Sequence, residues 1–123
     1  MEHIKEAKRY IQNAREILSE KAKKQDGFYT DKKYVKMAGH TAYLGVLLAL
    51  DNVLGVKKKG RKSVEWYNEE LAKKDKKISS IFDSTYDLLH LSLGYDGNPD
   101  AEVAQIAFKN AERIIEWAEL KSN

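Results

Sequence analysis

The segment GVKKKGRKS, Gly55–Ser63, has residue types that could bind phosphate groups. It is one insertion away from the phosphate-binding loop G-x-x-x-x-G-K-[ST], in which a lysine and then a serine or threonine directly follow the second glycine. Its cations are Lys57, Lys58, Lys59, Arg61 and Lys62. Arg61 and Lys62 are out of register with that loop, and the preceding segment reads as helix rather than strand. The segment therefore predicts a turn between two helices whose five cations form an anion or nucleic-acid patch.

A second candidate site lies in the apolar segment before this turn, where His40, Tyr43 and Asp51 are the residues with useful chemistry. A carboxylate in such a setting is unusual, because burying an unpaired charge is costly. Three interpretations of Asp51 stay open. It reaches water near a helix end, it pairs with a cation such as Arg9 or Arg15, or it lines a ligand cleft with His40 and Tyr43. No second carboxylate or nucleophile is placed to form a catalytic pair, so no catalytic residue is predicted.

Asp83, Asp87 and His90 follow one another at i, i+4 and i+7, and the last two have the Asp-x-x-His spacing found in dinuclear metal bundles. Those bundles need two such motifs and further glutamates, and only one motif is present here. A rotation of 100° per residue also places these three side chains opposite the apolar face of their helix. The pattern predicts a solvated polar face, and neither a metal nor a cofactor is expected.

The apolar spacing divides the chain into four helical segments. The first ends near residue 24, and the second runs over about 32–54 with Thr30 or Asp31 as its cap. Gly55 suits a left-handed helix stop, and Ser63 suits the cap of the third segment, 64–93. That third helix would be about 45 Å long at 1.5 Å per residue, so a kink or break is expected near 73–77. Asn98 is the predicted cap of the last helix, with Pro99 in its first turn.

The second segment is apolar nearly all round, which is typical of a helix that is surrounded by its own core or by a partner subunit. One face carries the small residues Ala38, Ala42, Gly45 and Ala49, which would let a neighbouring helix approach closely. The other face carries Met37 and the interface candidates Leu44, Leu47 and Leu48. The fold class predicted from these segments is all-α: an antiparallel, up-and-down four-helix bundle with a long third helix.

The 123 residues fit one domain, 1–123, with a single hydrophobic core. Cysteine is absent, so neither disulfides nor zinc–thiolate sites are expected. The amino terminus lacks the apolar core of a signal peptide. The longest uncharged apolar run, 37–50, is shorter than the roughly 20 residues of a membrane span. These features predict a cytoplasmic protein that makes no membrane contact.

Charge is distributed unevenly along the chain. Residues 1–62 hold 15 Lys and Arg against 7 Asp and Glu, and residues 63–123 hold 7 against 12. Such asymmetry can mark a nucleic-acid surface. It can also arise from helix pairs that attract each other in an antiparallel bundle, and this second interpretation is favoured.

The segments YIQNAREIL, AGHTAYLGVLLALDNVLG and AFKNAERIIEWA, in this order around a long third helix, resemble the HEPN superfamily of prokaryotic helical bundles or a small family close to it. Catalytic members of that superfamily cut RNA with an R-x(4-6)-H motif contributed by paired subunits. Here Asp83, Ser84 and Thr85 stand where the arginine before His90 would be, so ribonuclease activity is not expected. The resemblance implies an all-α bundle that is often dimeric and sometimes acts beside a nucleotidyltransferase or in a toxin–antitoxin pair.

The leading hypothesis is a non-catalytic helical interaction module that forms a homodimer through an apolar face of the second helix. The alternative is nucleic-acid binding, or partnership with a nucleotidyltransferase or a toxin–antitoxin protein, through the basic surface. Another protein of the same operon is a further candidate partner. A divergent ribonuclease is the least favoured hypothesis.

Overall fold

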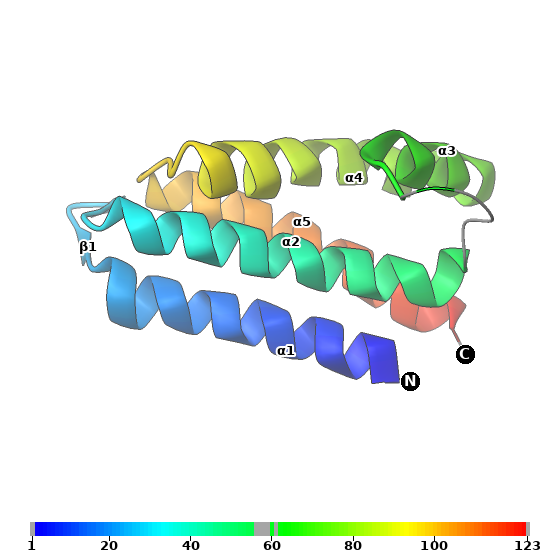
Figure 1. Cartoon of the computed structure of the whole chain (residues 1–123), viewed down its shortest axis with the longest axis horizontal. Helices are drawn as coiled ribbons and strands as arrows, with labels where there is room; N and C mark the ends of the chain where they lie inside the picture. The colour runs from blue at the N-terminus through cyan, green and yellow to red at the C-terminus, as the bar shows by residue number, and fades with distance from the viewer. Residues whose placement is uncertain (1, 56–59, 61, 123) are drawn as a thin grey trace.

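The structure, a computed structural model, describes residues 2–55, 60 and 62–122 (Figure 1). The helices are α1 (Glu2–Glu16), α2 (Lys32–Leu54), α3 (Val64–Lys74), α4 (Lys76–Thr85) and α5 (Ala101–Lys121). Two π-helical segments extend them, η1 (Ile17–Ala22) after α1 and η2 (Tyr86–Tyr95) after α4. A hairpin of two short strands, β1 (Lys24–Gln25) and β2 (Phe28–Tyr29), joins η1 to α2. The described residues are mostly helical, which confirms the all-α class.

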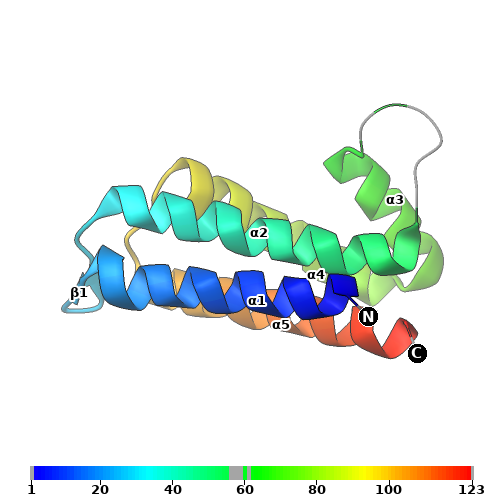
Figure 2. The same ribbon diagram turned by 60° about the horizontal axis from the view of Figure 1, so that its bottom comes forward.

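Helix α2 is central in the arrangement of the helices. It packs against α1 on one side, against η2 on another and against α5 on a third. The hairpin reverses the chain, so α1 and α2 run in opposite directions side by side (Figure 1). In Figure 2, α3 rises away from the long axis that the other helices follow.

The third helical segment is broken at Asp75, inside the interval 73–77 where a break was expected. Asp75 has an extended backbone (φ −162°, ψ 104°), and its N–H still donates to the Leu71 carbonyl at 2.7 Å. Its carboxylate then caps α4 by accepting hydrogen bonds from the backbone N–H groups of Lys77 and Ile78. One residue thus ends one helix and starts the next. The described residues form five α-helices rather than the four that were predicted.

Three predicted helix ends match the structure. The Asp31 carboxylate caps α2 by accepting from the Lys33 N–H at 3.2 Å. Gly55 ends that helix with φ 79°. The Ser63 hydroxyl caps α3 by accepting from the Trp66 N–H at 3.1 Å. Each of these signals is local, because a cap needs only a side chain and a backbone group a few residues away.

The predicted start of the last helix was wrong by two residues. The cap of α5 is Asp100, which accepts from the Glu102 N–H at 2.9 Å. Asn98 instead accepts from the Asp100 N–H at 3.0 Å. The Pro99 carbonyl accepts from the Tyr29 N–H at 2.8 Å, so pairing with the hairpin holds this segment outside the helix.

The core combines buried alanines of α1, η1, α2 and α5 with larger apolar side chains. The largest fully buried side chains are Phe82, Phe108, Ile4, Leu50, Leu71, Leu89, Leu93, Ile114, Val35, Val46 and Thr85. A Cβ added at Gly45 would lie 3.0 Å from the Ala7 carbonyl oxygen, so α1 and α2 approach closely at the small-residue face of α2, as the sequence predicts.

Helix α2 is long and apolar enough to cross a membrane by length and composition alone. Of its most apolar window, 44% is buried inside the structure. Core helices of soluble proteins pass the same test, and the packing of α2 on three sides is that of a core helix.

Candidate functional site

Two glycines bring α2 and η2 into close contact. A Cβ added at Gly39 would lie 2.6 Å from the Gly94 backbone nitrogen and 2.7 Å from the Leu89 carbonyl oxygen. A Cβ added at Gly94 would lie 2.9 Å from the His40 ring. The absence of a side chain at both positions therefore lets the helices approach and leaves room for His40 beside η2.

Five rings gather at this crossing, and we name them the His–Tyr cluster: His40, Tyr43, Tyr86, His90 and Tyr95. His90 is central. Its ring centroid lies 4.9 Å from that of Tyr43, 5.1 Å from Tyr86, 5.3 Å from Tyr95 and 5.5 Å from His40. The Nδ1 atom of His90 is buried and has no hydrogen-bond partner among the described residues. His40 and Tyr95 are exposed, so the cluster reaches the surface.

The prediction of a solvated polar face holds for Asp83 and Asp87, which are exposed, and was wrong for His90. The prediction assumed a regular turn of 100° per residue. From Tyr86 onward the chain is instead a ten-residue π-helix, whose turns are wider because its hydrogen bonds run from i to i+5. The wider turns rotate His90 toward α2. Within the described part of the chain, no group of three or more His, Asp or Glu side chains could hold a metal ion.

The residues of the predicted cleft separate into two places. His40 and Tyr43 both belong to the His–Tyr cluster, and Asp51 makes its contacts elsewhere. Its Oδ1 accepts hydrogen bonds from the Tyr67 hydroxyl at 2.7 Å and from Lys62 Nζ at 2.9 Å. Asp51 is thus paired with a cation, but with Lys62 rather than with Arg9 or Arg15. Those two arginines pair with acidic residues of α1 and α5.

The Asp51 contacts join the end of α2 to α3. Lys62 Nζ lies 5.4 Å from the ring centroid of Trp66, so the same cation also faces an aromatic ring. Burial raises the pKa of Tyr67, and its hydrogen bond to Asp51 raises that pKa further. Tyr67 therefore stays protonated at neutral pH, and its hydroxyl remains a hydrogen-bond donor to Asp51.

Of the predicted basic patch, only Lys62 can be placed. Lys57, Lys58, Lys59 and Arg61 lie outside the described residues. Lys62 is bound to Asp51, and its side chain is 25% exposed. The uneven charge along the chain is matched by ion pairs between the halves, since Lys8 and Arg15 of α1 pair with Glu119 and Glu112 of α5.

The outward side of α2 is apolar, and we name it the α2 face: Met37, His40, Leu44, Leu47 and Leu48. Leu44 is 52% exposed and Met37 is 46% exposed. Leu47 and Leu48 are half-buried and pack against the core. Of the three predicted interface residues, Leu44 is therefore the one that is mainly accessible. Met37 was placed on this face by the sequence but was not among the predicted interface residues, although it lies seven residues from Leu44 on the same stripe.

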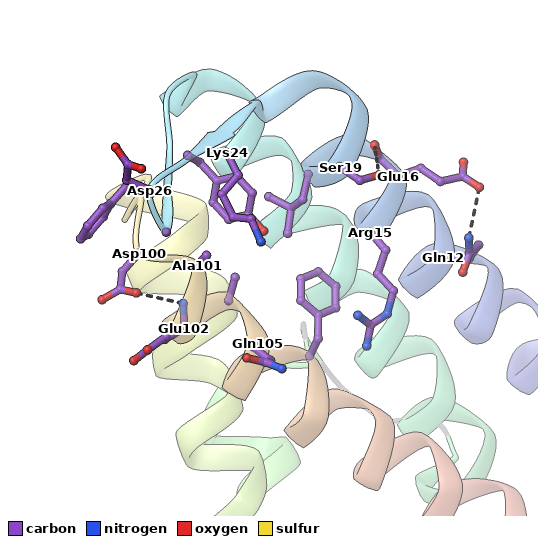
Figure 3. A pocket seen from close by; sticks show the side chains of 16 residues that line it. Gln12, Arg15, Glu16, Ser19, Lys24, Asp26, Asp100, Ala101, Glu102 and Gln105 are labelled. Atoms are coloured by element: carbon purple, nitrogen blue, oxygen red, sulfur yellow. Dashed lines mark hydrogen bonds between the residues drawn. The ribbon is translucent and has the colours of Figure 1, made fainter.

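A groove of about 950 Å³ lies between α1–η1 and α5, and the hairpin closes one end of it (Figure 3). In Figure 3, Arg15 extends from α1 toward α5, and the Gln12 side chain donates a hydrogen bond to the Glu16 carboxylate at 3.2 Å. A second groove of about 320 Å³ continues along α1 and α5 and shares Gln12 and Arg15 with the first. We name the two together the α1–α5 groove. Sequence reasoning missed it, because periodicity within one helix does not show how far apart two helices pack.

Lowering the pH should destabilise the protein through His90. Burial and the nearby His40 lower the pKa of His90 from its ordinary value of 6.5. The folded state therefore binds fewer protons at this site than the unfolded state, and stability falls as pH drops below the unfolded value. His90→Phe should flatten this fall in urea unfolding between about pH 7.5 and pH 5.5. The exposed His3→Gln serves as control, and an unchanged pH dependence in His90→Phe would contradict the assignment.

Comparisons with known proteins place the chain in one family. Its structure is similar to that of a protein of unknown function from Dyadobacter fermentans, with a TM-score of 0.94 and 58% sequence identity, over 97% of this chain and 95% of that one. No curated protein matches the sequence. None of these comparisons points to the HEPN superfamily in particular. A family model described as a domain of unknown function (DUF5618) matches residues 2–120. Because that match spans nearly the whole chain, the protein belongs to the DUF5618 family.

Proposed function

We propose that this protein is a non-catalytic helical interaction module that self-associates through the α2 face. The observation that carries the proposal is the exposure of Met37 and Leu44 on the central helix, 46% and 52% respectively. Single exposed apolar residues are common on protein surfaces. These two share one stripe with His40, and the run 37–50 of this helix contains no Lys, Arg, Asp or Glu. An uncharged stripe of this kind is typical of a surface that a partner covers.

A second copy of the chain fits this surface better than an unrelated partner does. Leu44 lies midway between Met37 and Asp51, seven residues from each. In a two-fold symmetric dimer with antiparallel α2 helices, Leu44 would meet its own copy, because such an interface uses one patch twice.

The mass in solution tests this proposal. Light scattering at micromolar concentration should give about 28 kDa, twice the 14.1 kDa of one chain. Leu44→Glu should return the mass to that of one chain, since it places a charge at the centre of the apolar contact. Ile106→Glu is the matched control, because Ile106 on α5 is 54% exposed and lies outside the α2 face. A wild-type monomer, or equal dissociation by both variants, would refute the proposal.

Nucleic-acid binding through the basic turn receives less support. Its case rests on the sequence, because Lys62, the cation of the patch that can be placed, is already bound to Asp51. A different protein of the same operon would bind the same α2 face that the leading proposal assigns to a second copy of the chain. In that case the wild-type chain would be monomeric by itself, and the mass measurement separates the two possibilities.

A further inference from the structure

The hairpin forms the end wall of the α1–α5 groove. The hairpin is attached to the start of α5 by backbone hydrogen bonds, from the Tyr29 N–H to the Pro99 carbonyl at 2.8 Å and from the Ala101 N–H to the Gly27 carbonyl at 3.0 Å. Gly27 has φ +84°, which a glycine adopts readily, so the hairpin turns tightly there. The hairpin thereby joins the end of η1 to the start of α5 at the wide part of the groove (Figure 3).

The groove is acidic although the chain as a whole has a net charge of +3. The carboxylates that line its wide part are Glu16, Asp26, Asp100 and Glu102. The narrow part adds Glu112, Glu116 and Glu119. The cations of the lining are Lys8, Arg15 and Lys24. The described lining therefore carries a net charge of −4, opposite in sign to the whole chain.

The cations of the groove already neutralise part of this charge. Lys8 pairs with Glu119 at 2.9 Å, and Arg15 pairs with Glu112 at 3.0 Å. Within the described part of the chain, no cation lies at ion-pair distance from Glu16, Asp26, Glu102 or Glu116. The positive end of the α5 dipole opposes cation binding nearby, but Asp100 caps that end by accepting the Glu102 N–H. The unneutralised carboxylates thus favour a cationic occupant.

Arg15 shows how this groove holds a guanidinium group. Its Cζ lies 4.9 Å from the ring centroid of Phe108, and Glu112 binds the same side chain from α5. Stacking on a ring combined with a carboxylate contact is the arrangement that arginine favours. The lining of the wide part also contains the rings of Phe28 and Tyr29 and the carboxylate of Asp26, so it includes the same two chemical groups. Phe28 is 52% exposed, so its ring is accessible to a ligand.

We propose that the α1–α5 groove binds a basic peptide segment, rich in arginine and apolar residues, from a partner protein. The acidic rim attracts the cations, and the half-buried rings and apolar floor accept the side chains between them. This surface shares no residue with the α2 face, so the proposal is independent of self-association.

The probe is a short fluorescent peptide of alternating arginine and leucine residues, and fluorescence anisotropy measures its binding to the wild-type chain. The double variant Glu16→Lys/Glu102→Lys should bind about tenfold more weakly, because it reverses two rim charges. Glu65→Lys/Glu69→Lys on α3 makes the same change in net charge outside the groove and should bind like the wild type. Phe28→Ala should also weaken binding. A peptide of alternating glutamate and leucine should not bind.

Three results would overturn the proposal: no binding of the arginine peptide, equal weakening by both charge-reversal pairs, or equal binding of the glutamate peptide. Light scattering provides a separate measurement, the mass of the Glu16→Lys/Glu102→Lys variant in solution. This mass should equal that of the wild type. A loss of self-association in this variant would mean that a second copy occupies the groove, which would also overturn the proposal. Leu44→Glu should bind the arginine peptide normally, so failure of one proposal remains distinguishable from failure of the other.

Discussion

Replacing Phe82 with alanine should lower the free energy of unfolding by about 3–5 kcal/mol, the range for removing a buried phenylalanine ring. The side chain of Phe82 is fully buried. Its ring centroid lies 6.4 Å from that of Tyr43 and 5.9 Å from that of Tyr67. Native domains are stable by only about 5–15 kcal/mol, so the loss would remove a large share of the total. Urea unfolding followed by circular dichroism measures it.

Phe28→Ala is the matched control for this measurement. It deletes the same ring at a position that is 52% exposed, and surface changes of this kind usually stay within about 0.5 kcal/mol. Equal losses in Phe28→Ala and Phe82→Ala would contradict the placement of Phe82. Phe82 also contacts both a member of the His–Tyr cluster and the tyrosine that binds Asp51, so its loss should loosen both regions. Increased amide hydrogen exchange at Tyr43 and Tyr67 would report that loosening.

Gly39→Ala should destabilise the protein by about 2 kcal/mol and lower Tm by roughly 5–10 °C, as expected when an interior is overpacked. In an exposed helix the same change would stabilise by about 1 kcal/mol. At Gly39 the added methyl group would lie 2.6 Å and 2.7 Å from backbone atoms of η2 and 2.8 Å from the Leu93 Cβ. Backbone atoms cannot move aside as a flexible side chain can, so α2 and η2 must separate. Thermal unfolding by calorimetry measures the effect.

Gly45→Ala provides the comparison on the same helix. Its added Cβ would lie 3.0 Å from the Ala7 carbonyl oxygen and 3.0 Å from the Tyr10 Cβ, a milder overlap. The gain in helix propensity should offset much of that overlap, and the net change should stay within about 1 kcal/mol. If Gly45→Ala proved more harmful than Gly39→Ala, the α2–η2 crossing would not be the tighter contact. Gly39→Ala should also separate His40 from His90 and reduce the pH dependence assigned to His90.

Local signals in the sequence were sufficient for most helix boundaries. The interval 32–54 follows from Asp31, the apolar spacing and Gly55, and the structure has α2 over Lys32–Leu54. The length of the third segment predicted a break near 73–77, and the structure has it at Asp75. Capping and helix stops depend on residues a few positions apart, so a single sequence contains the necessary information. The all-α class follows from the same short-range patterns.

Contacts between distant segments decided the rest. Asn98 has the right type for a cap, but pairing of Pro99 with the hairpin moved the start of α5 to Asp100. The sequence predicted that His90 lies on a solvated polar face. The π-helix instead directs its side chain toward α2, where it belongs to the His–Tyr cluster. A π-helix has wider turns than an α-helix, and it forms where tertiary packing favours it. The residue spacing of the sequence therefore did not predict it.

By itself, then, the sequence determined an all-α chain, most of its helix caps, its central apolar helix and a break within residues 73–77. Only the tertiary structure decided that His40 meets His90, that Asp51 binds Lys62 and that carboxylates from α1, the hairpin and α5 line one groove. The reason is that secondary structure depends on neighbours within one or two turns. The composition of a site depends on which faces of remote helices pack together, and on residues such as Gly39 and Gly94 that set how closely they approach.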